Sequence, residues 1–119
     1  MKNIFGGYIR EKREALRKTD RSYSLRQVAS RIGVEPSYLS KIERGDLKTY
    51  LIEEKLRALA HELGEDPDVL LAMSGKISAD IQKIIRKRPQ LFAQLIRDIK
   101  DMPDHAVLRI VREVRDGDW

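Results

Sequence analysis

Four polar side chains lie close together in the stretch VEPSYLSKIERG, residues 34–45: Ser37, Ser40, Lys41 and Arg44. If this stretch is a helix, each residue turns by about 100°, and the four side chains share one face with Tyr38 on its flank. Short hydroxyl and cationic side chains on such a helix can approach a DNA major groove, where they reach base edges and phosphates. An ordinary solvated helix face would show the same pattern, so the stretch alone leaves both interpretations open.

Glu43 is a charged residue on the other face of the same stretch, which it shares with Leu39 and Ile42. A carboxylate buried among apolar side chains is costly unless a cation pairs with it. Arg13 offers this cation, because it falls on the apolar face of the expected first helix, and Arg can bind a carboxylate through two parallel hydrogen bonds. We therefore predict a structural ion pair between Arg13 and Glu43.

The elements that must position these residues are all helical, because the apolar residues recur with helical periodicity and no alternating strand pattern is present. Ser24 is expected to cap the second helix, with Gln27 as its capping-box partner, and Asp66 to cap the fifth. Ile52 is expected on the inward face of the fourth. The first five helices are expected at about residues 5–18, 24–32, 36–45, 50–63 and 66–74.

Three further amphipathic helices are expected after Gly75, at about residues 78–88, 89–102 and 103–115. Three helices in 44 residues make a poor core on their own, so their apolar faces need a partner. We place the domain boundary near Gly75 for this reason. The residues expected in a dimer interface are Ile84, Phe92, Leu95, Ile99, Val107, Ile110 and Val111.

Charge is unevenly distributed along the chain of 119 residues, whose formal net charge is +5. Residues 1–50 hold twelve Lys and Arg against six Asp and Glu, whereas residues 51–75 hold two against six. The basic excess therefore accompanies the stretch at 34–45, as expected for a nucleic-acid-binding surface.

Several functional classes are not expected. The chain has no cysteine, which excludes disulfides, thiolate zinc sites and a cysteine nucleophile, and indicates a reducing cytoplasm. No apolar run is long enough for a signal peptide or a membrane span. The two histidines, His61 and His105, lie in different helical segments, and no phosphate loop or nucleophile motif is present, so we expect no metal, no cofactor and no enzymatic activity.

The stretch SLRQVASRIGVEPSYLSKIERG, residues 24–45, resembles the Cro/phage-repressor type of helix-turn-helix, the XRE family. The shared pattern is a Leu-x-x-Val-Ala helix, Gly-Val, a recognition helix and an Ile-Glu-x-Gly ending, and the resemblance covers about residues 9–73. It implies a five-helix, lambda-repressor-like domain that binds double-stranded DNA, with base contacts from Pro36, Ser37 and Lys41 and phosphate contacts from Ser24, Leu25 and Arg26. The full set of expected DNA-binding residues is Ser24, Arg26, Pro36, Ser37, Tyr38, Ser40, Lys41 and Arg44.

Two departures from the family limit this comparison. The connection RKTDRSYS is longer than in compact phage repressors; its basic residues Arg17, Lys18 and Arg21 could reach further phosphates, but a solvated loop is the favoured interpretation. Pro36 and Ser37 stand where members that recognise adenine carry paired glutamines, so the operator preference does not transfer.

These features predict a cytoplasmic transcriptional regulator with a DNA-binding domain at 1–75 and a C-terminal dimerisation segment at 76–119. As a dimeric repressor it would bind the two half-sites of a palindromic operator. The tail weakly resembles that of repressors of mobile elements and defence systems, some of which a partner metallopeptidase inactivates by cutting the tail. The alternatives are an antitoxin whose tail binds a toxin and which represses its own operon, and a nucleoid protein with little sequence preference.

Overall fold

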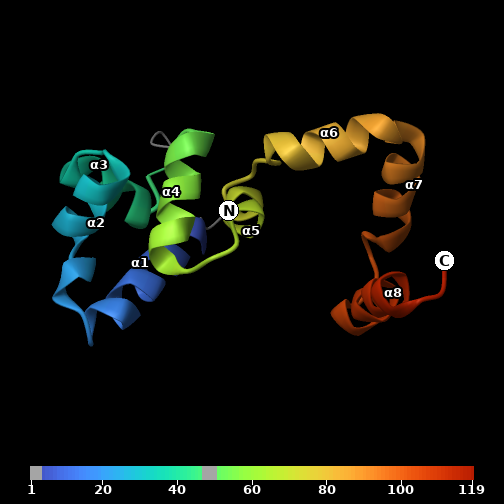
Figure 1. Ribbon diagram of the computed structural model, residues 1–119, viewed down its shortest axis with the longest axis horizontal. Coiled ribbons are helices and arrows are strands. Elements are labelled where there is room, and N and C mark those ends of the chain that lie inside the picture. Colours follow the sequence, from blue (N-terminus) through green and yellow to red (C-terminus); the bar gives the residue numbers. More distant parts are fainter. Residues whose placement is uncertain (1–3, 47–50) are drawn as a thin grey trace. The chain divides into compact units, whose positions relative to one another are not determined.

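The computed structural model describes residues 4–46 and 51–119, and every regular element in this part of the chain is a helix (Figure 1). The predicted all-α fold is thereby confirmed. The chain divides into two compact units, Met1–Ala79 and Asp80–Trp119.

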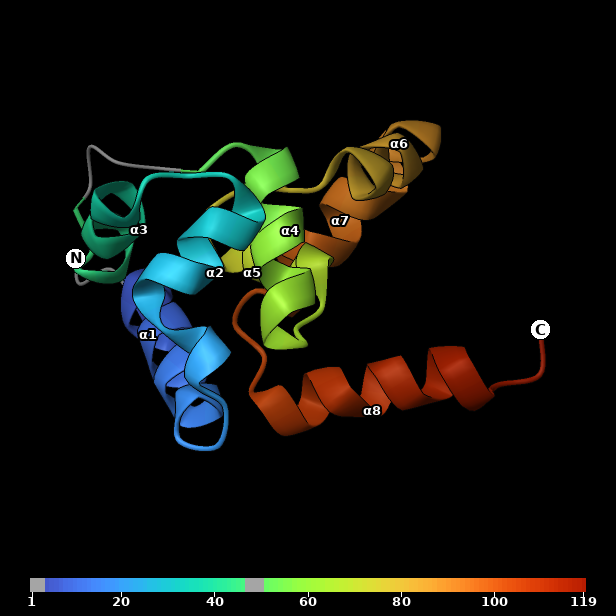
Figure 2. The ribbon, with the colours of Figure 1, turned by 60° about the vertical axis from the view of Figure 1, so that its left-hand side comes forward.

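The first unit contains the five predicted helices and one short 3₁₀ helix that the sequence pattern did not indicate. Gly33, with a φ of +78°, forms the tight turn between the second and third helices, and the two helices pack against each other (Figures 1 and 2). A left-handed conformation of this kind favours glycine because a Cβ would collide with the backbone. The elements are α1 (Ile4–Arg17), η1 (Arg21–Tyr23), α2 (Leu25–Ile32), α3 (Pro36–Glu43), α4 (Glu53–Leu63) and α5 (Pro67–Met73).

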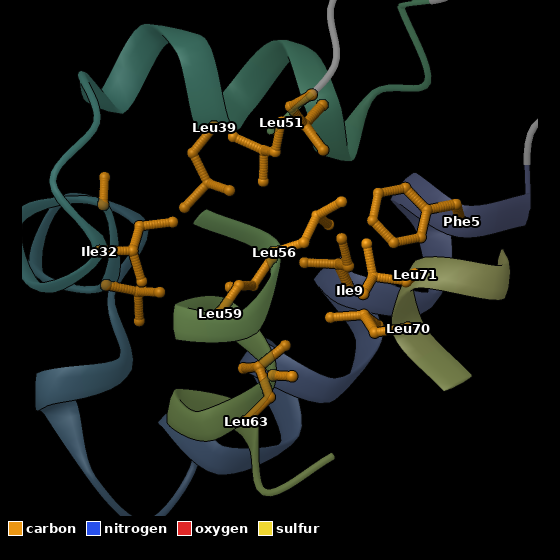
Figure 3. Packing of buried hydrophobic residues seen from close by; sticks show 14 residues of the cluster. Phe5, Ile9, Ile32, Leu39, Leu51, Leu56, Leu59, Leu63, Leu70 and Leu71 are labelled. Atoms are coloured by element: carbon orange, nitrogen blue, oxygen red, sulfur yellow. The ribbon is translucent and has the colours of Figure 1, made fainter. Parts of the chain in front are cut away.

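The core of this unit collects buried apolar side chains from all five α-helices. Leu56 and Leu59 of α4 lie near its centre, with Leu39 of α3 above them and Leu70 of α5 to one side (Figure 3). Complete burial of such a side chain is worth about 1.5 to 3 kcal/mol. Leu39 therefore fixes one face of α3 against the core, and the opposite face is turned to solvent.

Two local predictions were wrong. Ile52, expected to face inward, is 54% exposed, because it precedes α4 in an extended conformation and the neighbouring Leu51 fills the core instead. Gln27 was expected to complete a capping box, but the backbone N–H of Ser24 donates to the carbonyl of Arg21, 3.2 Å away, in the last turn of η1. Tyr50, the expected start of the fourth helix, lies outside the described residues.

Gly6 allows α1 to pack unusually close to the end of α3. A Cβ at this position would overlap the carbonyl oxygen of Ile42 and lie 2.9 Å from that of Glu43. A Cβ on the next residue, Gly7, would have open space around it. The absence of a side chain at residue 6 is therefore a condition for the contact between α1 and α3.

The second unit consists of α6 (Ala79–Lys87), α7 (Pro89–Ile99) and α8 (Asp104–Asp116), with α6 beginning on the last residue of the first unit. Pro89 and Pro103 stand at the helix starts, where a missing N–H and a fixed φ are tolerated. None of these three helices contains a buried residue. The apolar side chains of Ile84, Leu91 and Val114 are more than half exposed, and those of Leu95 and Val111 are nearly half exposed.

Candidate nucleic-acid interface

The outer face of α3 carries the polar side chains that the sequence pattern singled out. Ser37 and Lys41 on α3 and Arg44 at its C-terminal cap are exposed, Ser40 is half-buried, and Tyr38 at the edge of the face is 37% exposed. Pro36 occupies the first turn, where proline favours helix initiation. The structure therefore brings these six residues together on one short helix and its cap, and Ser37, Lys41 and Arg44 lie on the side away from Leu39.

The inner face of α3 is fixed by the ion pair between Arg13 and Glu43. Arg13 Nε donates to Glu43 Oε2 at 2.7 Å and Arg13 Nη2 to Glu43 Oε1 at 2.9 Å, a two-point contact between a guanidinium and a carboxylate. Arg13 is 3% exposed and Glu43 is 6% exposed. The positions that the sequence analysis gave to both residues agree with this geometry.

Arg13 makes two further hydrogen bonds, which the sequence pattern did not indicate. Its Nη1 donates to the carbonyl oxygen of Tyr23 at 3.1 Å and its Nη2 to Glu14 Oε1 at 3.1 Å. The hydrogen bonds from Arg13 to Glu43 raise the pKa of Arg13, so its guanidinium stays charged over the whole physiological range. One side chain of α1 thus connects η1 with α3.

The start of α2 offers unpaired backbone donors. Ser24 Oγ accepts from the N–H of Gln27 at 3.2 Å, and the N–H of Ser24 is bonded to Arg21. The first N–H groups of a helix have no intrahelical acceptor. In the first turn of α2, the N–H groups of Leu25 and Arg26 therefore have no acceptor among the residues that the structure describes. Together with the exposed side chain of Arg26, they form a group that suits an anion such as a phosphate.

Two basic residues beside these elements were missed by the sequence analysis. A Cβ on Gly33 would lie 2.8 Å from Lys55 Nζ, so the ammonium group of Lys55 sits beside the turn between α2 and α3. Arg31 Nε donates to Glu62 Oε2 at 2.8 Å, and its guanidinium lies 5.3 Å from the ring centre of Tyr23. Both arrangements join residues far apart in the sequence, which helical periodicity does not predict.

The basic connection between α1 and α2 is an ordered turn. Asp20 Oδ1 accepts from the backbone N–H of Ser22 at 2.9 Å and from its hydroxyl at 2.7 Å, which caps η1. These hydrogen bonds lower the pKa of Asp20. Arg17, Lys18 and Arg21 are all exposed, and Arg17 Nη1 lies 3.6 Å from Glu14 Oε2.

Neither a metal site nor a membrane span is found in the described ranges, 4–46 and 51–119. His, Cys, Asp and Glu side chains form no group of three or more there that could hold a metal ion. None of the helices in these ranges has the length and apolar character needed to cross a bilayer.

The comparisons with known proteins gave one result. A family model described as a helix-turn-helix domain matches residues 14–76, more than half of the chain and nearly all of the first unit after its opening turns. No curated protein and no solved structure gave a significant match.

Proposed function

The chain belongs to the helix-turn-helix domain family, whose members are typically DNA-binding regulators, and from this premise we propose that it is a dimeric repressor of the Cro/phage-repressor type. In this proposal the first unit binds double-stranded DNA and the second joins two copies. Binding of the dimer at a promoter would exclude the transcription machinery.

One observation carries the proposal: the polar face of α3 is exposed while its other face is fixed to α1 by a buried ion pair. When α3 lies in a major groove, the short side chain of Ser37 and the long, flexible side chain of Lys41 can both contact base edges. Arg44 at the end of α3 suits a phosphate contact. Because the ion pair fixes the inner face of α3, the helix is already ordered before DNA binds to its outer face.

The start of α2 supports the same surface. The N–H groups of Leu25 and Arg26, with the side chain of Arg26, suit a phosphate of the DNA backbone. Such contacts carry no sequence information, but they set the position of α3 on the duplex.

Dimerisation supports specificity in this proposal. One recognition helix contacts only a few base pairs, and a two-fold dimer contacts two half-sites about 34 Å apart. The exposed apolar side chains of α6, α7 and α8 supply a surface for this purpose. A protease that removed the tail would separate the half-site contacts and release the DNA.

Selection of bound duplexes from a random pool tests the proposal most directly. A repressor is expected to enrich a palindromic sequence, with half-sites spaced by one helical turn. Once this site is known, Lys41→Ala is expected to weaken specific binding by about 1 to 3 kcal/mol and to change binding to random DNA much less. Arg10→Ala, which removes an exposed charge from α1, is the matched control.

Other outcomes would favour other functions. Equal losses on specific and random DNA would make Lys41 a phosphate contact, and no enrichment of any sequence would favour a nucleoid protein. A chain that remains monomeric in solution, with the apolar faces of α6–α8 still uncovered, would favour the antitoxin function, in which a toxin covers these faces.

A further inference from the structure

Two opposite charges flank the exposed apolar stripe of α7. Leu91 and Leu95 lie one turn apart on this stripe and line an open groove together with Phe92, Ile84, Lys87 and Arg88. Arg88 is the N-cap of α7. Asp98 lies two turns beyond Leu91 on the same side, near the C-terminal end.

The placement of these charges disfavours α7 as an isolated helix. The N-terminal end of a helix carries a partial positive charge and the C-terminal end a partial negative charge. Arg88 lies at the N-terminal end and Asp98 lies near the C-terminal end, so each side chain has the same sign of charge as its end of the helix. The two side chains also cannot pair with each other, since ten residues of helix separate them by about 15 Å. Neither forms an ion pair with any residue that the structure describes.

We infer that α7 pairs in antiparallel orientation with α7 of a second copy of this chain, with Arg88 of each copy opposite Asp98 of the other. A two-fold axis beside residue 93 produces both ion pairs at once, because in a two-fold contact each residue pair occurs twice. The same axis places Leu91 of one copy opposite Leu95 of the other. The second copy thereby covers the groove, and each charge meets its opposite at both ends.

This inference rests on the proposed dimer and specifies its orientation. A parallel arrangement would place Arg88 against Arg88 and Asp98 against Asp98, which repel. The antiparallel one also aligns the two helix dipoles favourably, end to opposite end. Charge complementarity of this kind selects orientation and partner.

The test uses two charge reversals in the full chain, Arg88→Glu and Asp98→Lys. Each variant alone places like charges opposite one another twice per dimer, so the dimer dissociation constant is expected to rise by about tenfold or more. Mixing the two variants is expected to restore the dimer. In the mixed dimer the glutamate introduced into one copy faces the lysine introduced into the other, and the native Asp98 of the first copy faces the native Arg88 of the second. Sedimentation of the separate and mixed proteins measures this directly.

Loss of the dimer in the single variants cannot be attributed to melting of α7. A negative charge at its start and a positive charge at its end both favour the helix. Arg97→Glu is the matched control, since it reverses an exposed charge on the opposite side of the same helix from Arg88, and it should leave the dimer intact.

The inference would be overturned by a mixture that stays monomeric, or by single variants that dimerise as tightly as the parent chain. A parent chain that is monomeric at micromolar concentration would refute the dimer itself, and the antiparallel pairing with it.

Discussion

At the scale of single residues, Glu43 is a buried charged residue of the first unit on which stability is expected to depend. It is 6% exposed, and both carboxylate oxygens accept from the guanidinium of Arg13. Loss of Arg13 leaves Glu43 as a buried charge without its counterion, and loss of Glu43 leaves the buried Arg13 with the half-buried carboxylate of Glu14.

We therefore expect Glu43→Ala to lower the free energy of unfolding by about 3 to 5 kcal/mol, measured by chemical denaturation. Glu11→Ala, the same change at an exposed position of α1, should stay within about 0.5 kcal/mol of the parent. Replacing Arg13 and Glu43 together by apolar residues of similar volume should cost less than the single change. If Glu43→Ala denatures like the parent, the pair contributes nothing to stability and α3 is held by its apolar contacts alone.

Asp20 gives the turn before α2 a dependence on pH. Its pKa is lowered by the hydroxyl and the N–H of Ser22. Since the folded pKa lies below the unfolded one, ordinarily about 3.8, this stabilisation is complete above that value and is lost as the pH falls through the folded pKa. Ser22→Ala removes one donor and should raise the pKa of Asp20, as measured by NMR titration.

Thr19→Ala is the control for this titration, because the Thr19 hydroxyl donates to the carbonyl of Leu16 and not to Asp20. An Asp20 pKa that is unchanged by Ser22→Ala would show that the hydroxyl makes no such hydrogen bond in solution.

The residue-scale predictions succeeded where helical periodicity determines which way a side chain points. Residues 13 and 43 fall on the apolar faces of their helices, which is enough to predict their pairing. The contact of Arg13 with the Tyr23 carbonyl was not predictable, because it depends on η1, a short turn without periodicity. The DNA-binding residues remain a prediction, since exposure on α3 does not by itself distinguish a base contact from a solvated side chain.

At the scale of elements, the packing of α1 on α3 depends on Gly6. Its Cα approaches the carbonyl groups of Ile42 and Glu43 so closely that a methyl group has no room, whereas Gly7 is open. The two adjacent glycines thus allow a matched comparison.

Gly6→Ala is expected to destabilise the protein by about 1 to 3 kcal/mol, as overpacking forces the helices apart. Gly7→Ala should instead stabilise it by about 0.5 to 1 kcal/mol, because alanine favours the helix at a site with free space. Thermal denaturation of the two variants gives the comparison. Equal stabilisation by both changes would mean that α1 and α3 lie further apart in solution.

Helix starts were predicted from local signals, and they succeeded or failed for local reasons. Ser24 and Asp66 cap their helices as expected, because a cap depends only on residues two or three positions away. The predicted capping box between Ser24 and Gln27 is not formed, because η1 already supplies an acceptor for the Ser24 N–H. The predicted burial of Ile52 was wrong, because apolar periodicity cannot show where a chain changes from extended to helical. Leu51 occupies the core position instead.

At the scale of the whole molecule, the first unit extends a few residues beyond Gly75, near which the domain boundary was expected from the sequence. Lys76 Nζ donates to the carbonyl of Leu51 at 3.2 Å, Ser78 is fully buried, and the N–H of Ala79 donates to Glu53 Oε1 at 3.1 Å. These contacts join residues 76–79 to the start of α4.

A fragment ending at Ala79 should therefore be folded and more stable than one ending at Gly75, measured by thermal denaturation. Light scattering should show that both fragments are monomers, since they lack the proposed interface. A fragment ending at Ala79 that is still a stable dimer at micromolar concentration would place the interface in the first unit and leave α6–α8 for another partner.

A point change in α8 tests the same interface in the full chain. Ile110→Asp introduces a charge on the apolar face and is expected to give monomers whose first unit denatures as in the parent, with a steep loss of operator affinity. His105→Asp, on the opposite face of α8, should leave the dimer unchanged. The division into a packed unit and a set of uncovered helices follows from apolar patterning, whereas the partner of those helices depends on a second molecule and not on one chain's pattern.

The three-way contact of Arg13 restricts how this sequence can change over evolutionary time. A guanidinium that bonds Glu43, Glu14 and the backbone of Tyr23 has no equivalent among the other side chains, since lysine lacks the planar fork. A lineage that altered residue 13 or residue 43 alone would pass through a protein that had lost a large part of a typical stability of about 5 to 15 kcal/mol. The two positions are therefore expected to be inherited together, while the exposed face of α3, the proposed DNA contact, remains free to diversify on the same scaffold.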